Sequence, residues 1–227
     1  LMMDGSGRVM RERALAADGA PALPVLQTLA RELGVWFLAG SLTLRTGEER
    51  IANRSLLISD QGEVIASYDK IHMFDVELAG GESYRESRNF EAGNKAVLAD
   101  LPWGTLGLTI CYDLRFPHLY RVLAKSGARF LAIPSAFTRQ TGEAHWHMLQ
   151  RARAVEASAY VVSAAQVGKH ADGRSTYGHS LVVDPWGEVL AVRAEGEGVV
   201  IADVDAKRLA QVRQQLPALL HRRLFSS

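Results

Sequence analysis

Two segments of this 227-residue chain align with each other without a gap. They read SLLISDQGEVIA, residues 55–66, and SLVVDPWGEVLA, residues 180–191. Each has an apolar run, a turn closed by Gly-Glu and a second apolar run, which is the pattern of a β-hairpin. Shared turn chemistry would explain only the turn, whereas the similarity also covers both strands. The repeat therefore predicts two similar half-domains related by a pseudo-twofold axis.

Helical and strand patterns alternate along the rest of the chain. Apolar residues at helical spacing predict helices over residues 22–33, 117–125, 144–159 and 207–216. Strands are expected over residues 34–44, 106–111, 130–136, 160–167 and 199–205, with hairpins over 53–70 and 179–193. Residues 1–20 read as a loop with one helical turn, and residues 77–95 as a long loop. The sequence thus predicts an α/β fold, a four-layer α-β-β-α sandwich with two facing sheets and helices outside.

The composition is that of a globular protein, with 48% hydrophobic and 22% charged residues. A net charge of +1 gives no support to a nucleic-acid partner, and no apolar stretch is long enough to cross a membrane. One cysteine cannot form an intramolecular disulfide, which favours a reducing, cytoplasmic location. Because no linker-like segment divides the chain, residues 1–227 are expected to form a single domain.

The only cysteine, Cys111, ends the apolar run LGLTIC, and Pro117 then begins a predicted helix. A strand-to-helix turn can hold a nucleophile exposed above a sheet, with the following backbone N–H directed at a developing oxyanion. A lone cysteine is more often a small buried hydrophobe. Its position at a strand end makes a catalytic role an equal alternative.

A catalytic thiol needs charged partners, and Lys70 is the first candidate. It ends the strand VIASYDK, so it also lies at a junction between a strand and a loop. A lysine beside a thiol lowers the thiol pKa and stabilises oxyanion charge. The loop that follows contains Glu82, Glu86 and Glu91, and spacing alone does not choose among them.

The histidines do not predict a metal centre. His145 and His147 lie two positions apart at a helix start and point to different faces. His72, Asp75 and Glu77 could imitate a metal site, but no Cys/His spacing supports one. No glycine-rich phosphate motif is present either. We therefore expect no metal and no cofactor.

Several motifs in order resemble the nitrilase, or carbon–nitrogen hydrolase, superfamily, and within it the Nit amidase branch that includes deaminated-glutathione amidases. They are YDKIHMFDVE, TICYDLRFPHLYR, PSAFTRQTGEAHWHMLQRARAVE, YVVSAAQVG, YGHSLVVDPWGE and HRR. The resemblance runs from about residue 22 to the C-terminus. It implies an α-β-β-α sandwich that forms a homodimer or a higher homo-oligomer.

The resemblance also implies a Glu-Lys-Cys triad with a second glutamate nearby. By motif position the lysine is Lys70 and the nucleophile is Cys111. The second glutamate is Glu86, because its sixteen-residue distance from Lys70 fits the family pattern. The triad glutamate is expected in a Pro-Glu turn just upstream of residue 1, with the domain's first strand and helix. His118 and His147 stand where the family commonly has glutamate.

The implied reaction is amide hydrolysis. The upstream glutamate deprotonates Cys111, the thiolate attacks a terminal amide, and ammonia leaves a thioester that water then hydrolyses. Lys70 and the backbone N–H of Tyr112 are expected to hold the oxyanion. Arg115 either anchors the nucleophile turn through a salt bridge, which is the preferred role, or attracts a substrate carboxylate.

The expected substrate is a small amide that carries a carboxylate, and the branch resemblance points to deaminated glutathione. Another superfamily activity, that of an ω-amidase or an N-carbamoyl amino-acid hydrolase, remains an alternative. Two alternatives belong to other functional classes. One is a non-catalytic relative that binds a metabolite, and the other is a protein that senses redox state through its thiol. The sensor is disfavoured because the sequence has no second, resolving cysteine.

Overall fold

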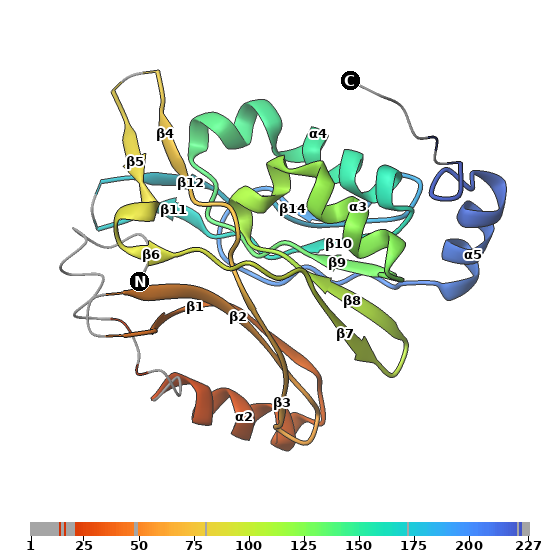
Figure 1. Cartoon of the computed structure of the whole chain (residues 1–227), viewed down its shortest axis with the longest axis horizontal. Coiled ribbons are helices and arrows are strands. Elements are labelled where there is room, and N and C mark those ends of the chain that lie inside the picture. Colours follow the sequence, from red (N-terminus) through yellow and green to blue (C-terminus); the bar gives the residue numbers. More distant parts are fainter. Residues whose placement is uncertain are drawn as a thin grey trace.

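The computed structural model describes Ala14, Ala16 and residues 21–47, 50–79, 81–171, 173–221 and 223. In these residues helices and strands form four layers (Figure 1). Helix α2 covers one side of the first sheet, the second sheet faces the other side, and helices α3 and α4 close the sandwich. The predicted α-β-β-α architecture is therefore confirmed. The loop predicted over residues 1–20 lies outside the described residues, apart from Ala14 and Ala16.

The first sheet is antiparallel along the order β1-β2-β3. Its strands are β1 (Phe37–Arg45), β2 (Ile51–Ile58) and β3 (Val64–Asp69), and the short β6 (Phe90–Glu91) adds to one end of β2 in parallel. Helix α2 (Ala22–Leu33) packs on this sheet through its fully buried Ala30 and ends at Gly34, which has φ 62°. The helix ends there because glycine adopts this left-handed conformation at little cost.

The second sheet has six strands in the order β14-β13-β10-β9-β8-β7. They are β7 (Val97–Leu101), β8 (Gly104–Leu108), β9 (Phe130–Ala132), β10 (Tyr160–Ser163), β13 (Ser180–Val183) and β14 (Val189–Arg193). Helices α3 (Pro117–Lys125) and α4 (Arg139–Ala157) cover one face and share an apolar core with it. A second core joins the opposite face to the first sheet. Helix α5 (Ala206–Gln215) adds Leu209 to this second core.

The two predicted hairpins have the same detailed geometry. In β2–β3 the register shifts between Leu57 and Ile58, and in β13–β14 it shifts between Val182 and Val183, the aligned positions. The turns also agree. Ser59 N donates to the carbonyl of Glu63 at 2.8 Å, and its equivalent in the second turn makes the same contact at 2.8 Å. The internal repeat is therefore a repeat of structure.

A helix holds each of these turns in the same way. Gln27 of α2 donates its side-chain amide to the Gly62 carbonyl at 2.8 Å. Arg151 of α4 donates Nε to the Gly187 carbonyl at 2.7 Å. Both glycines have positive φ, 76° and 90°. The equivalence of the half-domains thus extends from the hairpins to the helices that cover them.

Two predictions about individual segments are wrong. The long loop over residues 77–95 contains the hairpin β4 (Asp75–Glu77) and β5 (Ser83–Arg85), the 3₁₀ turn η1 (Glu86–Arg88) and β6. The strand predicted over residues 199–205 is not formed, and this segment pairs with no described strand. Apolar alternation marks a tendency to form a strand, whereas a strand in the sheet also needs a hydrogen-bonding neighbour.

Two further strands, β11 (Val167–Lys169) and β12 (Ser175–Tyr177), form a small antiparallel hairpin that the sequence did not predict. In Figure 1 this hairpin lies near β4 and β5, at the same end of the sandwich. None of the described helices is long and apolar enough to cross a membrane.

Candidate active site

Cys111 lies where the chain leaves the second sheet. Strand β8 ends at Leu108, and Cys111 opens the 3₁₀ turn η2 (Cys111–Arg115), directly before α3. Its φ of 50° is in the left-handed region, which costs a non-glycine residue about 1–2 kcal/mol. The backbone N–H of Cys111 donates to the Pro134 carbonyl at 3.0 Å. The sharp turn predicted from the strand-end cysteine is therefore present, and it is held under local strain.

A buried carboxylate stabilises this turn. Asp113 is completely inaccessible to solvent, and its Oδ2 accepts a hydrogen bond from the backbone N–H of Ile110 at 2.9 Å. This contact joins the residue before Cys111 to the residue two positions after it, much as an N-cap side chain closes the first turn of a helix. Sequence reasoning missed this residue, although an aspartate two positions after the cysteine is a recognisable capping signal.

Lys70 follows β3 and reaches the space between the two sheets. Its backbone N–H donates to the Asn53 carbonyl of β2 at 2.9 Å, and its side chain is only 1% exposed. The Nζ atom forms an ion pair with Glu86. A buried ammonium needs such a partner because the interior solvates charge poorly. Lys70 is thus not the exposed lysine that commonly ends a strand.

Three donors surround the carboxylate of Glu86. Besides Lys70, the backbone N–H of Phe74 donates to Oε2 at 2.7 Å and the Asn53 amide donates to Oε1 at 3.3 Å. The other two glutamates of this segment turn elsewhere. Glu82 accepts from the Tyr84 hydroxyl at 2.9 Å, and Glu91 accepts from the Thr46 hydroxyl at 3.0 Å. The structure therefore brings Lys70 together with Glu86. Asn53, which sequence reasoning missed, holds both residues.

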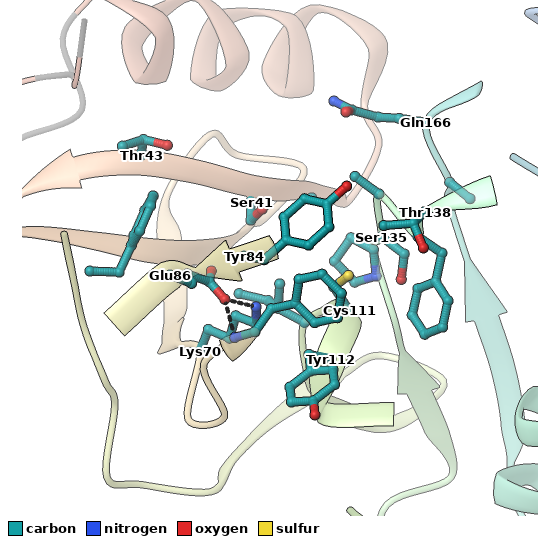
Figure 2. A pocket seen from close by; sticks show the side chains of 18 of the residues that line it. Ser41, Thr43, Lys70, Tyr84, Glu86, Cys111, Tyr112, Ser135, Thr138 and Gln166 are labelled. Atoms are coloured by element: carbon teal, nitrogen blue, oxygen red, sulfur yellow. Dashed lines mark hydrogen bonds and ion pairs between the residues drawn. The ribbon is translucent and has the colours of Figure 1, made fainter. Parts of the chain in front are cut away.

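Lys70, Glu86 and Cys111 line one cavity of about 1430 Å³ between the two sheets. Figure 2 shows the Cys111 sulfur in this pocket and the Lys70–Glu86 pair close to it. A pocket that contains a nucleophile, a fixed cation and a carboxylate has three of the groups that acyl transfer uses.

The surroundings of Cys111 act on its acidity in opposite directions. Burial raises the pKa of the Cys111 thiol, and the charges of Glu86 and Asp113 raise it further. The charge of Lys70 and a hydrogen bond with the Ala136 backbone lower this pKa, but burial is the largest effect. A base that accepts the thiol proton would therefore assist attack by the sulfur.

Tyr112 and Arg115 also line the cavity. The Tyr112 ring packs edge-on against Phe74, with 5.0 Å between ring centroids. The guanidinium of Arg115 lies over the rings of Tyr112 and Phe137 and contacts Nδ1 of His145 at 3.3 Å. No carboxylate of the described residues lies within ion-pair distance of Arg115. The salt bridge that would anchor the turn through Arg115 is therefore not found in this part of the chain.

The histidines lie outside this cluster of groups. His147 contacts Tyr177 and His179 edge-on and does not line the cavity. Burial, followed by the neighbouring His179, lowers the pKa of His147. Across the described ranges, no three His, Cys, Asp or Glu side chains are arranged to hold a metal ion.

Comparison with known proteins identifies the class. The family model described as carbon-nitrogen hydrolase matches residues 6–214. A protein named deaminated glutathione amidase from Yersinia enterocolitica is 41% identical over 220 residues, which cover 96% of this chain and 77% of that protein. One of the same name from Synechocystis sp. is 45% identical over 87% of this chain and 74% of its own length.

Solved structures agree with the sequence comparison. The C. elegans NitFhit protein has a TM-score of 0.88 and 39% sequence identity, over 96% of this chain. This chain spans about half of the NitFhit chain, 53%. The chain belongs to the carbon–nitrogen hydrolase family, within the Nit branch of the nitrilase superfamily. It is accordingly a hydrolase of carbon–nitrogen bonds, as the resemblance of its motifs implied.

Proposed function

We propose that this chain is the greater part of a cysteine-dependent amidase that releases ammonia from a small, carboxylate-bearing amide, and that its substrate is deaminated glutathione. The supporting observation is the buried Lys70–Glu86 pair, which opens with Cys111 into one cavity. The similarity to proteins named deaminated glutathione amidase, at 41% and 45% identity, supports the substrate.

The proposed reaction begins at the thiol. A glutamate, expected upstream of residue 1 from the family resemblance, accepts the proton of Cys111, and the sulfur attacks the amide carbon. The carbonyl oxygen becomes negative, and the Lys70 ammonium and the Tyr112 backbone N–H stabilise it. Each preorganised donor of this kind is worth about 3 kcal/mol.

The intermediate then collapses and the thioester is hydrolysed. The carbon–nitrogen bond breaks, and the nitrogen leaves as ammonia with the proton held by the glutamate. Water, deprotonated by the same carboxylate, attacks the thioester, and the products are a carboxylic acid and the free thiol. In this proposal Glu86 keeps Lys70 charged and in place.

Arg115 is proposed to attract the substrate carboxylate. The proposal is supported by its place on the cavity wall and by the lack of a carboxylate partner among the described residues. A guanidinium matches the two oxygens of a carboxylate, so Arg115 would select acidic amides over neutral ones.

The proposal is tested with the full-length protein and its Cys111→Ala and Cys111→Ser variants. We expect ammonia release from deaminated glutathione by the wild type and none above background by either variant, with unchanged circular dichroism. Ammonia release that persists at the wild-type rate in Cys111→Ala would refute the nucleophile.

The substrate is tested separately with a short panel. It contains deaminated glutathione, a dicarboxylate monoamide and an N-carbamoyl amino acid, each assayed for ammonia. Deaminated glutathione is expected to give the highest kcat/KM. A preference for the monoamide would indicate an ω-amidase, and a preference for the carbamoyl compound would indicate a hydrolase of that group.

We also propose that the protein is cytoplasmic and forms a homodimer or a higher homo-oligomer. The single cysteine supports a reducing compartment, and the family resemblance supports the assembly. Sedimentation of the full-length protein measures the oligomeric state. Subcellular fractionation measures the location.

A further inference from the structure

The carboxylate of Asp113 does more than close the cysteine turn. Its Oδ2 accepts from Ile110 N–H and from the Tyr68 hydroxyl, at 2.9 Å and 2.6 Å. Its Oδ1 accepts from the backbone N–H of His72 at 3.0 Å and contacts Nδ1 of the same residue at 2.7 Å. An ionised carboxylate is only an acceptor, so the Nδ1 atom of His72 carries the proton in this contact.

The residues that bind Asp113 flank the two reactive side chains. Tyr68 and His72 lie two positions before and after Lys70, and Ile110 directly precedes Cys111. One buried carboxylate therefore joins the end of β3 to the turn η2. The relative position of the Lys70 ammonium and the Cys111 thiol depends on this connection.

His72 is the one side chain among the described residues that contacts Asp113 through a nitrogen atom. The imidazole is 26% exposed and stacks on Phe116, with 3.6 Å between ring centroids and 6° between planes. Phe116 ends η2, so the ring of His72 contacts the far end of the turn while Nδ1 binds its third residue. Hydrogen bonding and stacking together fix the orientation of the imidazole.

We propose that His72 is a positioning residue for the amidase reaction: its Nδ1–H holds the carboxylate of Asp113, which sets Lys70 against Cys111. This inference rests on the proposed function, because it assigns His72 to the same site. His72 does not line the cavity and need not touch the substrate. It acts on the reaction through the two residues whose separation it controls.

The test separates the two contacts of His72 with matched variants of the full-length protein. His72→Asn keeps an N–H donor near the place of Nδ1 but loses the aromatic ring. His72→Phe keeps a ring that can stack on Phe116 but loses the donor. Kinetics with deaminated glutathione, thermal unfolding and the rate of Cys111 alkylation by iodoacetamide are measured for each protein.

We expect His72→Phe to lower kcat by at least about 10-fold with KM changed less than about twofold, because misplacement by 1 Å can cost about 10²-fold in rate. His72→Asn should retain kcat within about threefold of the wild type. A midpoint of thermal unfolding within a few degrees of the wild type for both variants shows that they fold. Wild-type kcat in His72→Phe, or an equal loss in both folded variants, would overturn the proposal.

The rate of Cys111 alkylation tests the positioning role of His72 separately from the proposed amidase function. Iodoacetamide needs only the thiolate, whose formation Lys70 favours. His72→Phe should therefore react more slowly than the wild type at pH 7.5, and His72→Asn should not. If no amide is hydrolysed by the wild type, the proposed function fails. Equal alkylation rates in all three proteins show that the positioning role fails.

Discussion

At the scale of single residues, the arrangement around Cys111 separates positioning from activation. The thiol is held in a left-handed turn beside a buried ammonium, yet burial keeps its pKa above the ordinary value. Holding the sulfur in place is thus the task of the turn, whereas activating it is the task of a base that accepts its proton. The surrounding charges tune the thiol pKa, and they can be removed one at a time.

Replacing these charges should change the pKa of Cys111 to different extents. Lys70→Gln removes a charge that lowers the thiol pKa, so this pKa should rise. Glu86→Gln removes a charge that raises this pKa but also removes the ion-pair partner of Lys70, so the pKa should change less than in Lys70→Gln. The rate of iodoacetamide alkylation between pH 6 and 10 measures the midpoint, and Cys111 is the one cysteine of these 227 residues.

Lys125→Gln is a matched control for these variants. Lys125 lies at the exposed end of α3, and its removal should leave the alkylation midpoint unchanged. A midpoint that falls or stays unchanged in Lys70→Gln would contradict the electrostatic explanation, since this variant removes the positive charge that lowers the thiol pKa.

Sequence patterns predicted part of this site and could not predict the rest. Cys111 and Lys70 both end apolar runs, so a local pattern is enough to select them. Glu86 was not distinguishable from Glu82 and Glu91 without the family resemblance, because the choice depends on how Asn53 of a distant strand approaches. Asp113 went unnoticed for a similar reason, since its partners Tyr68 and His72 come from β3 and the segment that follows it, more than 40 residues earlier in the chain.

At the scale of elements, local sequence signals predicted the helices more accurately than the strands. The structure confirms the helices over 22–33 and 117–125 to the residue, since Gly34 ends one and Pro117 begins the other. Helix α4 starts five residues before the prediction because Thr138 caps it through the N–H of Thr141. Strands depend on neighbours, so β7, β11 and β12 were missed and residues 199–205 were overpredicted.

A substitution at Gly142 in α4 tests whether tight packing outweighs helix propensity at this position. Alanine normally stabilises a helix by about 1 kcal/mol relative to glycine. At this position a Cβ would lie 2.3 Å from Cβ of Tyr177, an atom close to the backbone of β12 that cannot move aside. We therefore expect Gly142→Ala to lower the free energy of unfolding by roughly 1–3 kcal/mol.

Chemical denaturation of the full-length protein measures this change. Gly47→Ala is the control because a Cβ there would meet no atom within 4 Å, so its free energy of unfolding should change by less than about 1 kcal/mol. Stabilisation by Gly142→Ala would show that the helix and β12 separate more easily than the contact predicts.

At the scale of the whole molecule, the equivalence of the two half-domains has a measurable consequence. Each hairpin turn is held by one side chain of its own covering helix, Gln27 in one half and Arg151 in the other. Gln27→Ala should cost about 1 kcal/mol and Arg151→Ala about 1.5–3 kcal/mol, since the second donor is charged.

Arg139→Ala is the reference for these two variants. Arg139 pairs only with the exposed Glu143, one helical turn away, and such pairs are worth about 0.3–0.5 kcal/mol. Urea unfolding of the full-length protein measures all three. If Gln27→Ala and Arg151→Ala each lower the free energy of unfolding no more than Arg139→Ala does, these two hydrogen bonds do not hold the helices on the hairpins.

The shared bulge and turn contacts show that the two half-domains repeat one scaffold down to the register of their strands. The position that aligns with Lys70 is Glu195, which is exposed to solvent. One half thus has an ammonium in the interior, while the equivalent position of the other half has the opposite charge on the surface, so the two halves share a scaffold but contribute different side chains to the molecule.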